Sequence, residues 1–376
     1  SSTVTANGHV DLSASSTPTI RGLALGVALA ASSSTVGATA GGSGASATNT
    51  AKNTITALLS DGSRVEAGST DSNAVSVSAT DDASITTQVS AGFLGVTATT
   101  GGGGLAVGAV LGTNEVENTI TAGIGAANGS DSSTVVSQGG VDVSASSTAD
   151  VHAFGLAVAA TITVSESGAA FSGSGASLTN TIDNAITAVI RNGVEVDASG
   201  TSTNDSIDVS ALSDMTIHAS VGAGSLSVAV VSASVGASLA TSTVENSVTA
   251  AIDRAKVSTN GQDVNVIAQS QNSLDTRSVA TSLSVAIGGS AAGSSATSQD
   301  KSDTSAWVGS GSMVRTASVG GSGATDFGGL SIQASVSNST INAESDGGSL
   351  GLVAIGVFLA DAEISGSTQA SLATGS

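Results

Sequence analysis

One five-residue phrase occurs six times in the chain at a nearly fixed spacing, and this repeat constrains the fold more than any other feature. The clear copies read VDLSA, VSVSA, VDVSA and IDVSA, and the looser copies VNVIA and LSIQA follow them. They begin at Val10, Val75, Val141, Ile207, Val264 and Leu330. A period of this length indicates one supersecondary unit stacked on copies of itself.

A second phrase follows the first at a nearly constant distance in each unit. It reads NTITALL from Asn53, NTITAGI from Asn118, NAITAVI from Asn184 and NSVTAAI from Asn246, and it is degraded in the last two units. We therefore expect residues 1–376 to form a single elongated array, with variable loops between the repeat cores. The cores are about 10–59, 75–124, 141–190, 207–252, 264–308 and 330–372.

The residues inside a unit predict an all-β fold. Val, Ile, Thr, Ser and Ala alternate with period two, and no stretch has a sustained helical period. Glycine-rich interruptions such as Gly101 to Gly104 predict a turn in mid-unit, and Asp61-Gly62, Asn128-Gly129 and Asn192-Gly193 predict turns in the loops. We expect a β-solenoid. One wide turn per repeat is favoured over three narrow turns of about 22 residues, because no similarity is visible at the shorter period.

In-register stacking places equivalent residues in columns. Asn53, Asn118, Asn184 and Asn246 are predicted to form an amide ladder in which each side chain bonds the next. Two residues further on, Ile55, Ile120, Ile186 and Val248 are predicted to form an apolar ladder. Two threonine-rich columns face the other way, with Thr54 and Thr119 in one, Thr56, Thr121, Thr187 and Thr249 in the other.

Composition excludes several functions. The chain has 9 Lys and Arg against 29 Asp and Glu, for a net charge of −20, which disfavours nucleic acid as a partner. No apolar run is long enough for membrane insertion, and with no Cys there is no disulfide or thiolate site. No nucleophile motif and no basic, aromatic cleft is present. We therefore expect no enzyme activity, no catalytic residues and no cofactor site.

Charged columns are the remaining candidates for a site. Asp142 and Asp208 share a position in adjacent units, so they are weak calcium candidates, against the simpler interpretation of two hydrated carboxylates. Glu117, Asp183 and Glu245 form another column, with Lys52 at its end. His152 and His218 share a position that holds Arg, Thr or Asp in other units, which indicates a solvated outer face rather than a metal site.

The two phrases, with their Gly-, Ala- and Val-rich filler, resemble the repeats of large bacterial surface proteins, the filamentous-haemagglutinin-like and leukotoxin-like adhesins. The resemblance covers the whole chain and implies secretion, a stacked-strand stalk, and roles in adhesion, biofilm matrix or filament building. It implies an extracellular or cell-surface location in a bacterium. It names no host ligand.

These observations favour an extracellular structural protein, a stalk or filament subunit. The opening Ser2 to Gly8 resembles Lys256 to Gly261, a late loop, so the last residues could be followed by the first without a phase break. The expected partner is the chain itself, head to tail or within a longer chain. The alternative is a ligand-binding adhesin segment whose variable loops, such as Ser310 to Gly329, carry recognition, and ice binding by the threonine columns is a distant third.

Overall fold

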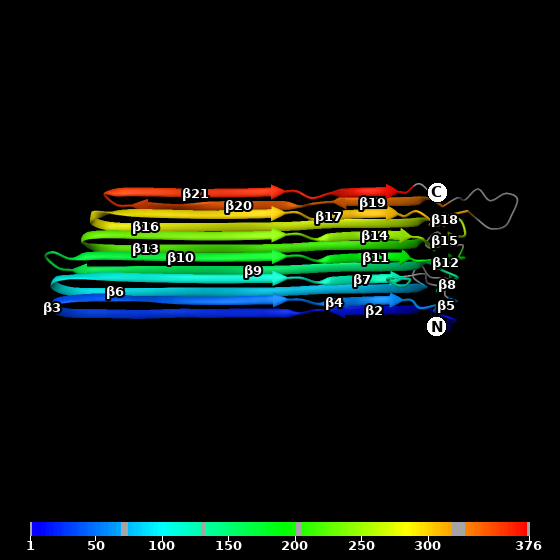
Figure 1. The fold of residues 1–376 in the computed structure, drawn as a ribbon, viewed down its shortest axis with the longest axis horizontal. Helices are drawn as coiled ribbons and strands as arrows, with labels where there is room; N and C mark the ends of the chain where they lie inside the picture. Colours follow the sequence, from blue (N-terminus) through cyan, green and yellow to red (C-terminus); the bar gives the residue numbers. More distant parts are fainter. Residues whose placement is uncertain (1, 69–73, 129–131, 201–204, 318–327, 374–376) are drawn as a thin grey trace.

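The structure, a computed structural model, describes residues 2–68, 74–128, 132–200, 205–317 and 328–373. Over these residues every regular element is a strand, and every pairing between strands is parallel (Figure 1). The all-β prediction is confirmed. Parallel stacking needs no hairpin between paired strands, because each strand pairs with the equivalent strand one sequence repeat further along the chain.

Two of the three sheets have six short strands each. Sheet A contains β1 (Thr3–Ala6), β5 (Arg64–Ala67), β8 (Thr134–Ser137), β12 (Glu195–Ala198), β15 (Lys256–Thr259) and β18 (Met313–Arg315). Sheet C contains β4 (Thr54–Leu59), β7 (Thr119–Ile124), β11 (Ala185–Arg191), β14 (Ser247–Asp253), β17 (Asp303–Val308) and β22 (Thr368–Leu372). Sheet C contains the second sequence phrase.

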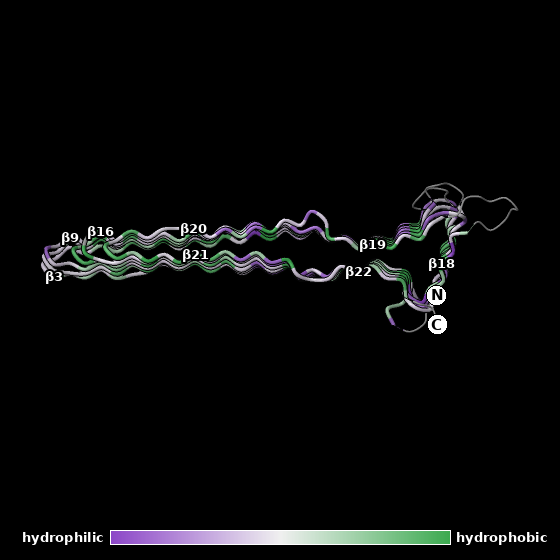
Figure 2. The backbone as a smooth tube through the Cα atoms, turned by 90° about the horizontal axis from the view of Figure 1, so that it is seen from above, coloured by the Kyte–Doolittle hydropathy of each residue, from purple (hydrophilic) through white to green (hydrophobic). Residues whose placement is uncertain are grey.

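Sheet B is built from ten longer elements, and it begins at the first sequence phrase. Its strands are β2 (Val10–Ser16), β3 (Thr19–Ala51), β6 (Val75–Val116), β9 (Val141–Val164), β10 (Ala169–Ile182), β13 (Ile207–Val244), β16 (Val264–Asp300), β19 (Leu330–Val336), β20 (Thr340–Leu350) and β21 (Val353–Ile364). In each repeat the chain runs outward, reverses at a far turn, and returns alongside itself (Figures 1 and 2). We call these halves the outward run and the return run.

The strand register follows the sequence repeat. Val75 pairs with Val141, and Asp142 with Asp208, each partner being 66 residues further along. None of the pairings between described strands joins residues about 22 apart, the spacing that three narrow turns would require. Length differences between repeats fall in the loops or near the far turn. Between Val228 and Val231, for example, the pairing of β13 with β16 shifts register.

The molecule has two regions with different cross-sections. In the first, sheets A and C and the start of sheet B surround a common core, and we call this region the base. In the second, only the outward and return runs of sheet B lie side by side (Figure 2). We call this region the arm, and define it by the paired residues 24–47, 89–112, 155–178, 221–240, 278–296 and 345–360.

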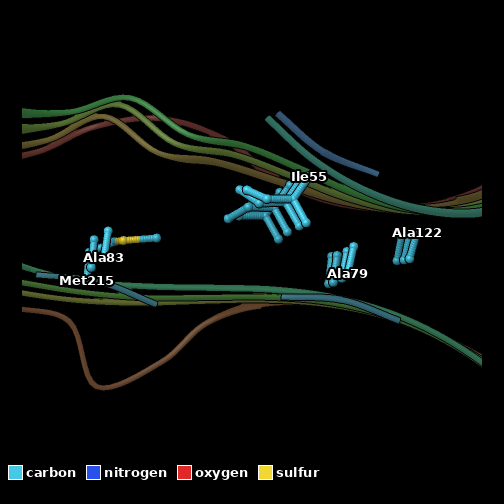
Figure 3. Packing of buried hydrophobic residues seen from close by; sticks show 14 of the residues in the cluster. Ile55, Ala79, Ala83, Ala122 and Met215 are labelled. Atoms are coloured by element: carbon cyan, nitrogen blue, oxygen red, sulfur yellow. The ribbon is translucent and has the colours of Figure 1, made fainter. Parts of the chain in front are cut away.

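The core of the base is a set of aliphatic columns. Ile120, Ile186 and Ile190 are fully buried, as are Val143 and Val209 of the facing strands. Figure 3 shows such side chains stacked one above another, at Ile55 and at Ala79 and Ala122 among others. Alternating residues of each strand point inward, so the period of two in the sequence becomes the inner face of every layer.

The interior of the arm contains mostly small and polar side chains. Hydroxyls pair across it, with Ser234 Oγ 2.7 Å from Ser282 Oγ and Ser238 Oγ 2.8 Å from Ser278 Oγ. The two runs approach so closely that a Cβ placed on Gly236 would lie 2.5 Å from the carbonyl oxygen of Thr281. Glycine at this position is therefore required by the contact between the runs, and the arm is a thin two-layer slab.

Two loop turns use the dipeptides that the sequence singled out. Asp61 and Gly62 have φ of 64° and 71°, and Asn192 and Gly193 have φ of 64° and 91°. Left-handed conformations of this kind favour Asn, Asp and Gly. The dipeptide Asn128-Gly129 extends beyond the described residues.

Candidate functional site

The predicted asparagine column lies at the corner between sheets B and C, with one member in each of four successive layers. The backbone N–H of Asn53 donates to Oδ1 of Asn118 at 2.8 Å, and that of Asn118 donates to Oδ1 of Asn184 at 2.8 Å. Asn184 N–H donates to Asn246 Oδ1 at 2.9 Å. The predicted side-chain-to-side-chain bonding is therefore wrong in detail. At this corner the backbone lies between two strands, and the side chain of the next layer supplies the acceptor that a strand would otherwise provide.

The side-chain amides of this column instead reach across the core. Nδ2 of Asn118 donates to Asp81 at 2.7 Å, and Nδ2 of Asn246 donates to Ser213 at 3.1 Å. Asp81 occupies the position that Ser147 and Ser213 occupy in the next layers. Burial raises the pKa of the Asp81 carboxyl from 3.8 to about 6, and the hydrogen bond from Asn118 opposes this shift. Asp81 is thus a charge-bearing exception in a row of serines.

A second asparagine column was missed by the sequence analysis, and it is the one that forms a true amide ladder. Asn49 Nδ2 donates to Asn114 Oδ1 at 2.9 Å, and Asn114 Nδ2 donates to Asn180 Oδ1 at 2.7 Å. Ser242 continues the column as an acceptor for Asn180 at 3.5 Å. All are buried. A Thr-Asn or Thr-Ser dipeptide just before each second phrase was the available signal.

The apolar column of Ile55, Ile120, Ile186 and Val248 lies in register on the inner face of sheet C, and all four side chains are buried. The columns headed by Thr54 and Thr56 lie on the outer face of the same sheet. Thr249 Oγ1 and Ser305 Oγ lie 3.1 Å apart. This outer face is only about six residues wide, because each strand of sheet C is short.

The acidic column on the outer surface has a cation at each end. Lys52 Nζ lies 2.6 Å from Glu117 Oε2, and Lys301 Nζ lies 3.0 Å from Glu245 Oε1. Asp183 lies between the two glutamates without a cation of its own in the column. Burial first, and then the charges of Glu245 and Glu117, raise the pKa of the Asp183 carboxyl. The arrangement links five layers electrostatically on an exposed surface, where each pair contributes little.

Asp142 and Asp208, the calcium candidates, are neighbours in adjacent layers. Ser144 donates to Asp142 at 3.0 Å, while Ser206 donates to Asp208 at 2.6 Å and Asn265 Nδ2 at 2.7 Å. Burial first, and then the Asp208 charge, raise the pKa of the Asp142 carboxyl. Neutral donors therefore satisfy these oxygens, and the described residues contain no cluster of three or more acidic or histidine ligands.

His152 and His218 stack on the outer face of the outward run, where the sequence placed them. Their ring centroids are 5.1 Å apart, and His152 Nε2 lies 3.2 Å from Asp150 Oδ2. They line a shallow groove of about 290 Å³ together with Thr86, Gln88, Phe154, Asp275 and Arg277. The groove combines an aromatic face, hydrogen-bond donors and both signs of charge.

The stack has an open edge at each end. Among the described strands, β2 and β3 pair only with β6, while β20 and β21 pair only with β16. Just after β21, the backbone N–H of Ser365 donates to the carbonyl oxygen of Asp300. Backbone N–H and C=O groups alternate in direction along a strand. The odd-numbered residues of β21 therefore direct these groups toward β16, and the even-numbered residues direct theirs toward the open edge. The 33 residues of β3 form a second long edge with no proline and one charged residue, Arg21.

Comparisons with known proteins identify no relative of this chain: no family model, no curated protein and no solved structure matches it. The described residues contain no helix long and apolar enough to cross a membrane. Function must therefore be argued from the geometry of the stack.

Proposed function

We propose that the chain is a β-solenoid of six repeats, each one wide turn, and that it serves as a structural stalk or filament unit outside a bacterial cell. The observation that carries this proposal is the pair of open sheet edges. A long strand with unpaired N–H and C=O groups is a template for a further strand. Here the strands at both edges pair with their inner neighbours in the same parallel register as the interior strands do.

The two ends also have compatible phases. Sheet A begins with β1, which precedes the first repeat core, and ends with β18. Sheet C begins with β4 and ends with β22, which follows β18 in the chain, so no strand of sheet A follows β22 among the described residues. A strand equivalent to β1 would therefore fit on β18 directly after β22. Further repeats of a longer chain, or a second copy joined head to tail, would continue all three sheets without a break. Backbone hydrogen bonds along the stack would then resist extension.

The resemblance of the repeats to those of bacterial surface adhesins supports an extracellular location. A second function, ligand binding by an adhesin segment, is favoured by the groove around His152 and Phe154. The sequence assigned that role to the variable loops, of which residues 318–327 lie outside the described structure. Glycan arrays probed with the wild-type chain and with Phe154→Ser would test this alternative, since loss of a signal in the variant would locate binding in the groove.

The edge-pairing proposal can be tested at Ala360, in the middle of the open edge strand β21. Its N–H points outward by the alternation described above, so Ala360→Pro removes no hydrogen bond within the chain but prevents an incoming strand from pairing. Electron microscopy and sedimentation should show end-to-end assemblies for the wild type and for the control Ala360→Ser, and their loss in Ala360→Pro with unchanged folding. A wild type that stays monomeric at high concentration would contradict edge pairing.

A further inference from the structure

The arm has few charged residues and exposes many large aliphatic side chains, whereas most charges of the chain lie elsewhere. The function proposed above does not require this distribution. The six stretches that form it contain only two charged residues, Glu166 and Asp346, and the remaining charges of the chain lie outside them. Large aliphatic side chains of the arm point outward on both faces. Leu111, Val235 and Leu239, for example, are exposed to 60%, 52% and 44%. The interior holds mostly small and hydroxyl-bearing residues, with a few buried large side chains such as Phe93 and Leu178, so the arm exposes far more apolar surface than the base.

The outer face of the return run is corrugated. It consists of the outward-pointing residues of 40–46, 105–111, 171–177, 233–239, 289–295 and 353–359, and we call it the return face. Two columns of this face alternate strictly between layers. Bulky residues occupy their second, fourth and sixth layers: Val107, Leu111, Val235, Leu239, Ile355 and Leu359. Small residues occupy the layers between them: Gly42, Ser46, Gly173, Ser177, Ala291 and Ser295. The column that contains Gly175 is small except for Val357, and the column that begins at Ala40 departs from the order, because Phe171 lies in the third layer and Ala233 in the fourth. In the two alternating columns ridges recur every two layers, about 9.6 Å apart.

The middle trough is an open, apolar groove of about 360 Å³, with Leu111 and Leu239 on its two sides and Gly175 on its floor. A Cβ placed on Gly173 or on Gly175 would meet no atom within 4 Å. Glycine at these two positions therefore answers no packing need within the chain. The trough lies on the surface of the arm, so any group that fills it belongs to another molecule.

We propose that the return face binds the return face of a second copy, shifted by one layer so that the ridges of each copy lie in the troughs of the other. Ridges and troughs have one common spacing on both copies, so the surface is complementary to itself after that shift. With the two arms antiparallel, the acidic bases lie at opposite ends, and salt screens their repulsion. The return face contains no charged side chain, so the two copies meet without the cost of burying a charge.

The size of the face is close to what this partner needs. Six layers about 4.8 Å apart and seven residues along each run give roughly 650–700 Å² of projected area per copy. This exceeds the largest apolar patch of a typical monomer, about 300–600 Å², and approaches the roughly 800 Å² per partner that stable interfaces bury. A lipid bilayer fits poorly, because the outward N–H and C=O groups of β3 and β21 would have no partners in hydrocarbon. The interaction joins stacks side by side, independently of head-to-tail growth.

The test uses chains whose head-to-tail growth is blocked by Ala360→Pro. Sedimentation equilibrium should show that this protein dimerises. Adding Gly173→Leu and Gly175→Leu fills the trough with apolar bulk, and it should weaken dimerisation at least about tenfold, because misfitting side chains prevent close packing. The matched control, Gly92→Leu, places the same side chain in open space on the outward run and should leave dimerisation unchanged. Circular dichroism would establish that each variant is folded.

The double leucine variant distinguishes shape-specific pairing of the two faces from non-specific apolar association. If dimerisation tightens when leucines fill the trough, the association is non-specific apolar adhesion and the proposal fails. A chain that remains monomeric with Ala360→Pro alone, at concentrations of tens of micromolar, would also overturn it. Flotation of that same protein with neutral phosphatidylcholine vesicles would overturn it in favour of a lipid surface.

Discussion

The base and the arm are built by the same repeat, yet they sort their side chains in opposite ways. In the base, Ile and Val columns fill the centre and charges lie outside, as in an ordinary soluble domain. In the arm, Ser, Thr, Gly and Ala make up most of a thin interior, with a few buried large side chains such as Phe93 and Leu178, and most Leu and Val side chains lie outside. A regular stack can therefore be stabilised by either arrangement, because backbone pairing between layers is the same in both regions. The difference indicates that the buried aliphatic columns of the base contribute most of the folding stability, whereas the arm mainly presents an exposed apolar surface.

The largest effect is expected from truncating the aliphatic columns. Ile186→Ala should lower the free energy of unfolding by about 2–5 kcal/mol, because it leaves a cavity in a fully buried column. Leu239→Ala in the arm should change it by less than about 0.5 kcal/mol, since that side chain is outside. Urea denaturation of both variants measures the contrast. Equal losses at the two positions would remove the distinction between the regions.

The amide ladder where the arm leaves the base should be the next most sensitive feature. Asn114→Ala removes the donor to Asn180 Oδ1 and one of the two acceptors of the Asn49 amide, which keeps Thr87, all in a buried setting. The expected cost is about 1–3 kcal/mol. Asn114→Ser is the matched control, because Ser242 occupies this column in the fourth repeat, and its cost should be smaller. If both variants unfold at the same denaturant concentration as the wild type, the ladder does not contribute to stability.

The thinness of the arm can be tested with a single methyl group. Gly236→Ala places a Cβ against the Thr281 carbonyl oxygen and should cost about 1–3 kcal/mol, because the two runs must separate locally. Gly92→Ala adds the same methyl group where nothing lies within 4 Å, so its cost should be close to zero. Thermal denaturation of the pair gives the comparison. A neutral Gly236→Ala would show that the runs are not in close contact.

The smallest effect concerns pH. The pKa of Asp81 is about 6 in the folded chain and near 3.8 when unfolded, so the folded state binds more protons between these values. Its contribution to stability is therefore largest near pH 4 and declines as pH rises through 6, by on the order of 1 kcal/mol. Asp81→Ser, which restores the residue found in the next layer, should remove this component. Denaturation of both proteins at pH 4.5 and pH 7 measures the difference, and identical pH dependence would contradict the assignment.

Much of the base could be predicted from the sequence, because repetition itself encodes register. Stacking requires equivalent residues to meet, so the recurrence of Asn118 and Ile120 in Asn184 and Ile186 predicted which residues become neighbours. The bonding at the asparagine corner was not predictable, since it depends on the direction in which the backbone N–H leaves the strand. That direction follows from the bend between β3 and β4, which residue spacing does not specify.

The arm was harder to predict, because its filler looks like low-complexity sequence. The absence of charge between Arg21 and Lys52, and again between Asp82 and Glu115, was visible but carries meaning only when the repeats are aligned. The alternation of Val107, Gly173 and Val235 between layers has a period of two repeats. It becomes a ridge and a trough only when the register places these residues on one face.

The central claim is that residues about 66 apart lie in adjacent layers, and spin labels measure this directly. Because the chain has no Cys, Gln88→Cys, Phe154→Cys and Ser220→Cys introduce unique labelling sites on the outer face of three successive layers. Labels at 88 and 154 should show strong dipolar broadening at a strand spacing of about 4.8 Å, and labels at 88 and 220 much weaker broadening at about twice that distance. Absence of broadening between 88 and 154, in a folded protein, would contradict the stack.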